Sequence, residues 1–427
     1  MRNWLIIAAV AMVAALAGCN TNTTNQPSLP DSSKGDGLAS AGLQIYWQAN
    51  IKLDGGERIK SAYLFPDEPA KTWVIYYLTT NRRVICYDAV VGTERWAASI
   101  TDAGQALYAP TQGPDVSITR TPQGIGGLVP ERGHELNTVT FHPMAINTEE
   151  TIFLIDRMTG EVFRRIAAHG ALTAGGCMNG QTYFAPAAEN GAYLAYSFQE
   201  GVLTNWRGSL GGSIKAAPVY EDDHVFVGGS TGQFHCTRVG AGYDAKVDWQ
   251  KDLSRGILAS VVVDRNACYV PVEDGRLYAF DARTGTALWT HPFTTEQPLE
   301  NSPQVSSNTL FQFSAGDKFY AIDPTKGAKR WDNPTAKTVL MVVKQDVYAI
   351  DTRNSLLVMD EAKGSVKATV SMDGFGIYAA NTKYSGIFIA SASGRIACIR
   401  TLDAGRLTPE VLTSTQPAKD TTTAPEK

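Results

Sequence analysis

The sequence predicts an all-β fold, an eight-bladed β-propeller built from four-stranded antiparallel blades. Two observations lead to this prediction. A strand–turn–strand pattern returns eight times along the 427 residues, and its copies lie about forty residues apart, a period typical of propeller blades. A third observation concerns closure, because an N-terminal strand resembles the strand that the last copy lacks.

The pattern is clearest in residues 275–289, GRLYAFDARTGTALW. Leu277–Phe280 is a short apolar and aromatic run, as expected of a strand in a packed sheet. Asp281 can accept a hydrogen bond from a turn N–H, and Gly285 can adopt the positive φ that closes a hairpin. Trp289 then buries a large flat surface on the returning strand.

The same offsets of four and eight residues recur elsewhere. Asp323, Gly327 and Trp331 repeat them, and so do Asp88, Gly92 and Trp96. With weaker copies included, the Asp position falls at residues 88, 156, 197, 238, 281, 323, 360 and 400, in steps of 68, 41, 41, 43, 42, 37 and 40 residues. Because these Asp, Gly and Trp residues follow the repeat, we interpret them as structural turn and packing residues, not as catalytic acids or a cofactor platform.

The propeller is expected to span residues 43–400. Inner strands are predicted just before each Asp position, at 72–78, 224–228, 267–272, 310–314 and 386–390. The last copy has no Trp strand after it, and Leu43–Ile51 alternates like a strand and contains Trp47. We therefore expect this N-terminal strand to complete the last blade and to remove exposed sheet edges.

The first step of the repeat is long, so the second blade carries an insertion, which lies within residues 101–142. This segment is polar and rich in Gly and Pro. Insertions in repeat folds often carry binding, but a decorative loop fits equally well. Residues 401–427 are rich in Thr, Pro and Lys and are predicted to form a disordered tail.

The N-terminus reads as a secretory leader over residues 1–18, with an apolar run that is short for a membrane span. Leu16-Ala17-Gly18-Cys19 resembles the bacterial lipobox, which implies acylation of Cys19 and anchoring to a membrane. Asn20, by resemblance to enterobacterial sorting, implies the outer membrane and a periplasmic orientation. Residues 19–42, mostly Thr, Asn, Ser, Pro and Gly, are expected to be a lipidated flexible tether.

The remaining composition gives few signs of chemistry. The five other cysteines are expected to be buried free thiols, because they lack a C-x-x-C motif and mostly occupy one small-residue position of the repeat. The six histidines form no metal-binding motif, and there is no P-loop, dinucleotide fingerprint or G-x-S-x-G elbow. A formal charge of −4 with 19% charged residues gives no footprint for nucleic acid.

The block A-x-D-x-x-T-G-x-x-x-W, met best at residues 279–289, resembles the repeat of the quinoprotein (PQQ-type) propellers. Size, blade number and lipobox are similar to those of the BamB lipoproteins of the outer-membrane β-barrel assembly machinery. That resemblance implies a non-enzymatic scaffold of the cell envelope, without a cofactor, which docks an outer-membrane assembly partner through loops on one face. The insertion in the second blade departs from this pattern.

Two alternatives remain open from the sequence. A quinoprotein dehydrogenase would hold a quinone and Ca²⁺ with carboxylates and an Arg, but those enzymes are longer and no such carboxylate set is identifiable in this chain. An envelope propeller that binds carbohydrate or peptide is the other alternative, and no residue of the sequence argues against it.

Overall fold

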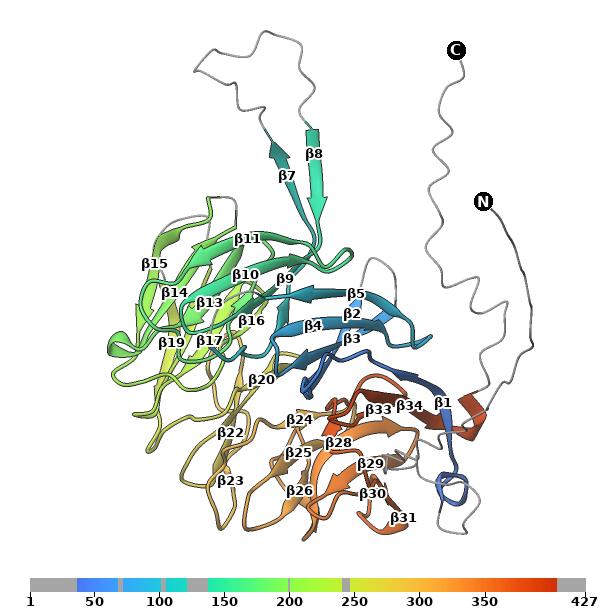
Figure 1. Cartoon of the computed structure of the whole chain (residues 1–427). Coiled ribbons are helices and arrows are strands. Elements are labelled where there is room, and N and C mark those ends of the chain that lie inside the picture. The colour runs from blue at the N-terminus through green and yellow to red at the C-terminus, as the bar shows by residue number, and fades with distance from the viewer. Residues whose placement is uncertain are drawn as a thin grey trace, which may run out of the picture.

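The computed structural model describes residues 37–67, 72–100, 105–120, 137–198, 200–239 and 246–404. Eight four-stranded antiparallel sheets follow one another around a ring, with a separate two-stranded hairpin projecting from it (Figure 1). The all-β class, the eight blades and the closure of the last blade by the N-terminal strand are thereby confirmed. Among the described residues, no helix is long and apolar enough to cross a membrane.

Blades 1 to 4 follow one another in chain order. Blade 1 is formed by β2 (Ile59–Asp67), β3 (Thr72–Thr79), β4 (Arg83–Asp88) and β5 (Glu94–Ser99). Blade 2 is formed by β6 (Thr111–Gln112), β9 (Pro143–Asn147), β10 (Thr151–Asp156) and β11 (Val162–Ala167). Blade 3 is formed by β12 (Cys177–Met178), β13 (Thr182–Pro186), β14 (Ala192–Ser197) and β15 (Leu203–Ser209). Blade 4 is formed by β16 (Val219–Glu221), β17 (His224–Gly228), β18 (Gln233–Arg238) and β19 (Lys246–Asp252).

Blades 5 to 8 complete the ring. Blade 5 is formed by β20 (Val262–Asp264), β21 (Ala267–Pro271), β22 (Arg276–Asp281) and β23 (Phe293–Thr294). Blade 6 is formed by β24 (Gln304–Val305), β25 (Leu310–Phe313), β26 (Phe319–Ile322) and β27 (Lys329–Asn333). Blade 7 is formed by β28 (Ala336–Val343), β29 (Asp346–Asp351), β30 (Ser355–Asp360) and β31 (Val366–Ser371). Blade 8 is formed by β32 (Ile377–Tyr378), β33 (Ile387–Ala390), β34 (Arg395–Thr401) and the N-terminal β1 (Leu43–Asn50).

Outside the blades are the hairpin, β7 (Val116–Arg120) paired with β8 (Asn137–Phe141), and three short 3₁₀ helices, η1 (Leu38–Ala41), η2 (Glu189–Gly191) and η3 (Leu402–Ala404). The hairpin lies between β6 and β9, so blade 2 does carry an extra segment within residues 101–142.

One strand assignment needs correction. The runs predicted as inner strands are β3, β17, β21, β25 and β33, which are the second strands of their blades. The first strands precede them and line the centre of the ring. Several first strands pair over only two residues, as β24 does with β25 at Gln304 and Val305. Such short segments lack the long apolar run by which a strand is recognised in a sequence.

The turn between the third and fourth strands has the same hydrogen bonds in several blades. In blade 5, Oδ1 of Asp281 accepts from the backbone N–H groups of Arg283 and Thr284 at 3.1 and 2.8 Å. The N–H of Gly285, at φ +70°, donates to the carbonyl of Asp281 at 2.8 Å. Equivalent bonds are made around Asp88 with Gly92 and around Asp323 with Gly327.

A Trp side chain in the fourth strand, or just before it in blade 5, links its blade to the next one. Trp289, 5% exposed, lies over the turn of blade 6, and its Nε1–H donates to the carbonyl of Pro324 at 3.0 Å. A Cβ at Gly327 would lie 2.5 Å from Cδ2 of that indole, so the position has room only for glycine. The same indole–glycine contact occurs at five junctions: Trp47 with Gly92, Trp96 with Gly160, Trp249 with Gly285, Trp289 with Gly327, and Trp331 with Gly364.

Of the other three junctions, the one between blades 3 and 4 has Trp206 at the Trp position, and two use other residues. At the Trp position of blade 2, Arg164 lies over Gly201 of blade 3. Blade 7 has Ala368 at that position, and its junction with blade 8 is filled by a cluster that includes Leu38 of η1 and Leu43 of β1. The N-terminal segment therefore supplies apolar packing where the indole is missing.

Candidate docking surface and central channel

The turns that join first to second strands and third to fourth strands lie at one end of the ring, because the strands of each blade alternate in direction. We call this end the turn rim. The β7–β8 hairpin leaves from it in blade 2, and so does the loop of residues 379–386 between β32 and β33 in blade 8. Exposed large apolar side chains of the described residues also belong to this end, at or just beyond the third-to-fourth strand turns: Met158, Val202, Val247, Leu288, Val366 and Leu402.

On blades 4 and 5 the turn rim carries charged residues in unfavourable backbone conformations. Asp222 and Asp223 have φ of 46° and 60°, and Arg265 and Asn266 have φ of 48° and 65°. Glycine would adopt this left-handed region without cost, and Asn and Asp tolerate it better than Arg does. Arg265 and Asn266 form the two-residue turn between β20 and β21, and such hairpin turns require positive φ.

His224 connects the acidic turn of blade 4 to the body of that blade. Its Nδ1 lies 2.6 Å from the carbonyl oxygen of Asp222, and its Nε2 lies 3.0 Å from Oδ2 of Asp248. The His224 ring therefore lies between two hydrogen-bond acceptors. Burial would raise the pKa of Asp248, but hydrogen bonds from His224 and Arg238 outweigh it and lower that pKa. Burial and the neighbouring Asp222 raise the pKa of Glu221.

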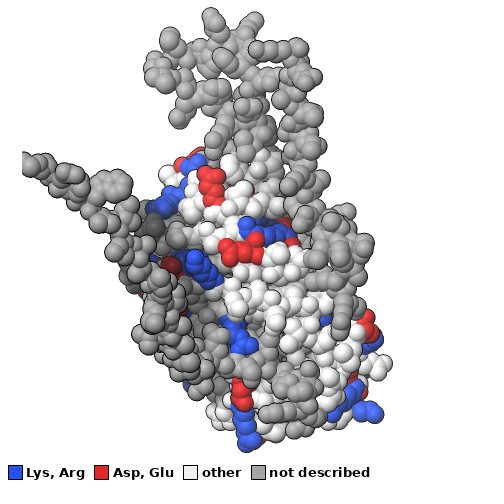
Figure 2. All heavy atoms as spheres, turned by 45° about the vertical axis from the view of Figure 1, so that its right-hand side comes forward, with Lys and Arg blue, Asp and Glu red and all other residues white. Residues whose placement is uncertain are grey.

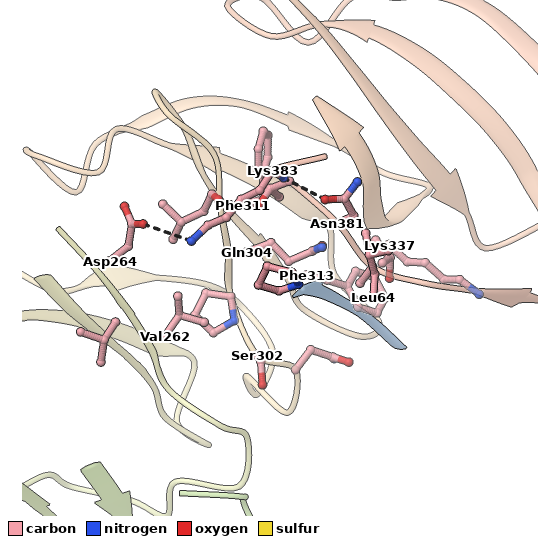
Figure 3. A pocket seen from close by; sticks show the side chains of 18 of the residues that line it. Leu64, Val262, Asp264, Ser302, Gln304, Phe311, Phe313, Lys337, Asn381 and Lys383 are labelled. Atoms are coloured by element: carbon pink, nitrogen blue, oxygen red, sulfur yellow. Dashed lines mark hydrogen bonds and ion pairs between the residues drawn. The ribbon is translucent and has the colours of Figure 1, made fainter. Parts of the chain in front are cut away.

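The loop of residues 379–386 reaches from blade 8 across to blades 7, 6 and 5. The N–H of Asn381 donates to the carbonyl of Val339 at 3.3 Å, and Oγ1 of Thr382 donates to the carbonyl of Val305 at 2.6 Å. Nζ of Lys383 lies 3.9 Å from Oδ1 of Asp264, the pair drawn at the left of Figure 3. This loop therefore ties three blades together at the mouth of the central channel.

Four cavities meet around residues 264 and 265. The largest, of about 570 Å³, follows the first strands of blades 5 and 6 and is lined by Asp264, Gln304 and Phe313 (Figure 3). The others lie between adjacent blades of the turn rim, and each is lined by Arg265. The turn rim of blades 4 to 6 is thus hollowed, and its charges are paired: Arg283 with Asp222 at 3.5 Å, and Arg265 with Asp264 at 3.5 Å.

A buried ionic cluster fixes the root of the hairpin. Arg157, 4% exposed, contacts Oδ1 of Asp115 at 2.6 Å and the carbonyl of Gly113 at 2.7 Å. Its Nε also lies 3.6 Å from Oδ1 of Asp67, which pairs with Arg95 at 2.6 Å. The ring of Phe141 at the end of β8 stacks on Phe163 of β11 at 4.8 Å. The hairpin is therefore held at its base to blades 1 and 2.

The sequence-derived residues fall into two groups. Asp88, Gly92, Trp96, Asp281, Gly285, Trp289, Asp323, Gly327 and Trp331 all lie in the turns and junctions described above and outside the rim cavities. Cys19, the proposed lipidation residue, lies outside the described residues, as does most of the leader and tether. The five cysteines of the described chain are free and buried.

No described group of three or more His, Cys, Asp and Glu side chains could hold a metal ion. On the face drawn in Figure 2, the described Lys and Arg side chains are interspersed with Asp and Glu, and uncharged residues cover most of the area. Arg265 and Lys383 could not be found from the sequence, because only the fold brings blades 5 and 8 together.

Eight four-stranded blades, with indole–glycine contacts at five of their junctions, define a β-propeller of the PQQ-repeat class. A family model described as "Outer membrane protein assembly factor BamB" matches residues 148–408, more than half of the sequence. The chain belongs to this BamB family.

Solved structures support the fold. The crystal structure of BamB from Moraxella catarrhalis is similar with a TM-score of 0.61 and 14% identity, covering 86% of this chain and 99% of that one. The computationally designed Ika8 protein is similar with a TM-score of 0.58 and 12% identity, covering 83% of this chain and 100% of its own. No curated protein matches the sequence.

Proposed function

We propose that this protein is a non-enzymatic scaffold of the cell envelope, anchored through Cys19 to the outer membrane and facing the periplasm. Its turn rim at blades 4 to 6 docks a protein of the outer-membrane β-barrel assembly machinery. Membership of the BamB family supports the assembly role. The hollowed rim with paired charges supports the docking surface.

The observation that carries this proposal is the placement of Arg265. Its side chain is 66% exposed, it lines three of the rim cavities, and its backbone is held at φ +48°. An exposed Arg beside Asp264 and Asp222 suits a partner surface with both charged and apolar groups, because Arg is enriched in the energetically dominant parts of interfaces.

A pulldown from detergent extracts of the envelope tests the proposal. The wild-type protein should recover an outer-membrane assembly component, and Arg265→Glu should reduce its recovery. Arg255→Glu is the matched control, because Arg255 is also exposed and precedes β20 at the opposite end of the ring. Equal recovery by both variants would contradict the docking surface, and absence of any assembly component would contradict the role.

The anchor and the absence of catalysis are tested separately. Cys19→Ala should move the protein from the membrane to the soluble fraction, because a leader without an acylated Cys leaves no lipid chain. A scaffold should also give no spectral shift with PQQ and Ca²⁺ and no dye reduction with alcohols. Either signal would favour the quinoprotein alternative.

A further inference from the structure

The central channel is continuous along the first strands. A second cavity, of about 480 Å³, shares Leu64, Lys337, Thr338 and Ala380 with the 570 Å³ cavity described above. Part of the wall consists of half-buried aromatic and aliphatic side chains from blades 1, 5, 6 and 8: Tyr63, Leu64, Phe65, Trp73, Val262, Phe313, Ile377 and Tyr378. Such a wall suits the apolar body of a ligand.

The charges of this wall are unbalanced. Asp264 is the one carboxylate that lines either cavity among the described residues, and it already forms ion pairs with Lys383 at 3.9 Å and with Arg265 at 3.5 Å. Lys60 and Lys337 line the second cavity, and no hydrogen bond or ion pair is found for either ammonium among the described residues. The channel is thus basic in a protein whose formal charge is −4.

Lys337 is the more informative of the two. It lies at the start of β28, is half-buried, and lines both cavities. In Figure 3 its side chain extends away from the Asp264–Lys383 pair, so that pair does not neutralise it. Neither Lys337 nor Lys60 has a hydrogen bond or ion pair among the described residues, so both ammonium groups are available to pair with the anionic head of a ligand in the channel.

We propose that the central channel binds an organic anion, with its apolar body against the aromatic wall and its anionic head at Lys337 and Lys60. The anionic head would lie in the second cavity, which none of the rim residues Asp222, Asp264 and Arg265 lines, whereas the 570 Å³ cavity also opens at the turn rim. The assignment does not depend on the proposed function. Within this site, Leu64 and Tyr378 would contact the apolar body of the ligand, and the two lysines would pair with its anionic head.

Two fluorescent probes of nearly the same shape test this assignment. The anionic probe is 8-anilinonaphthalene-1-sulfonate, and the neutral probe is N-phenyl-1-naphthylamine, which lacks the sulfonate. Both are titrated into the purified protein and into Lys337→Met. Lys363→Met is the matched control, because Lys363 is exposed in a turn of the same blade and lines neither cavity.

The expected result is a charge-specific loss. Lys337→Met should raise the Kd of the sulfonate probe about tenfold at low salt, the size of a single hydrogen bond to a charged group. It should leave the Kd of the neutral probe unchanged, and Lys363→Met should change neither. Added NaCl should weaken the sulfonate probe alone.

Other results would overturn the proposal. They are no saturable binding of the sulfonate probe by the wild type, equal losses for both probes in Lys337→Met, or no loss for either. Leu64→Trp guards against a folding artefact, since filling the shared neck of the channel should weaken both probes while the circular dichroism spectrum stays that of the wild type.

Discussion

Replacing Gly327 by alanine tests whether the indole–glycine contact sets the stability of the ring. Two costs add at this position. A left-handed backbone at φ +69° costs an alanine about 1–2 kcal/mol. The new Cβ would lie 2.5 Å from the buried indole of Trp289, and such overpacking costs about 1–3 kcal/mol more.

Gly316 supplies the matched control. It also has positive φ, +78°, but the nearest atom to an added Cβ is Cγ of Gln297 at 4.0 Å. Gly316→Ala should therefore show only the backbone cost of about 1–2 kcal/mol, against about 2–5 kcal/mol for Gly327→Ala. Guanidinium denaturation followed by far-ultraviolet circular dichroism measures both.

A double-mutant cycle isolates the contact. Trp289→Ala alone should cost about 3–5 kcal/mol, because it leaves a cavity and removes one hydrogen bond to the carbonyl of Pro324, which keeps the one from Tyr269. In the Trp289→Ala background, the steric cost of Gly327→Ala should disappear. The double variant should therefore be destabilised by about 1–3 kcal/mol less than the sum of the two single variants. If Gly327→Ala costs no more than Gly316→Ala, or if the two changes simply add, the contact does not have the role assigned to it.

Three further predictions concern other parts of the molecule. Arg157→Met should lower the free energy of unfolding, measured by urea titration, by about 2–3 kcal/mol. This is less than the loss of a fully buried ion pair would cost, because Asp115 is 35% exposed and Asp67 keeps its pair with Arg95. An unchanged urea midpoint would show that Arg157 does not hold the base of the hairpin. The hydroxyl of Thr325 lowers the pKa of Asp323 against burial, and at Asp281 burial is outweighed by hydrogen bonds from Thr284 and Arg283, which lower its pKa. The folded state therefore binds fewer protons than the unfolded state, so stability should be full above pH 4 and fall as pH decreases through the lowered values. Asp323→Asn should show a smaller dependence of the unfolding free energy on pH. Burial raises the pKa of the described cysteine thiols, that of Cys236 to about 12. Iodoacetamide should therefore label these five thiols only after denaturation, as counted by mass spectrometry. Rapid labelling of the native protein would contradict their burial.

The blade number was predictable because the Asp and Gly of each turn act locally. Asp281 needs only N–H groups two and three residues away, so its spacing to Gly285 is visible in the sequence. The first strands were not found, since strands such as β24 pair over two residues and depend on the ring for their place. The replacement of the indole by Arg164 was also invisible, because its partner Gly201 belongs to the next blade.

The residues of the docking surface and of the channel could not be predicted from the sequence, for a related reason. In the sequence, Asp222 and Asp223 are ordinary turn residues, and the sequence gives no sign of their left-handed backbone. Arg265 and Lys383 are 118 positions apart in the sequence and share a cavity only because the loop of residues 379–386 crosses the mouth of the channel. Lys337 is an ordinary lysine until the fold places it in the channel wall, where no described carboxylate pairs with it.

Ring closure and the proposed membrane attachment involve neighbouring parts of the N-terminal segment. β1 pairs with β34 from Leu43 to Asn50, and Trp47 donates to the carbonyl of Ala89 in blade 1 at 2.9 Å. Leu38, directly before β1, packs in the cluster between blades 7 and 8, where the indole is absent. A pull on the N-terminus would therefore act first on the packing of η1 and then on an edge strand. Because β1 pairs with β34 at seven residue pairs and is held by the buried indole of Trp47, this strand should resist a force applied through the proposed tether.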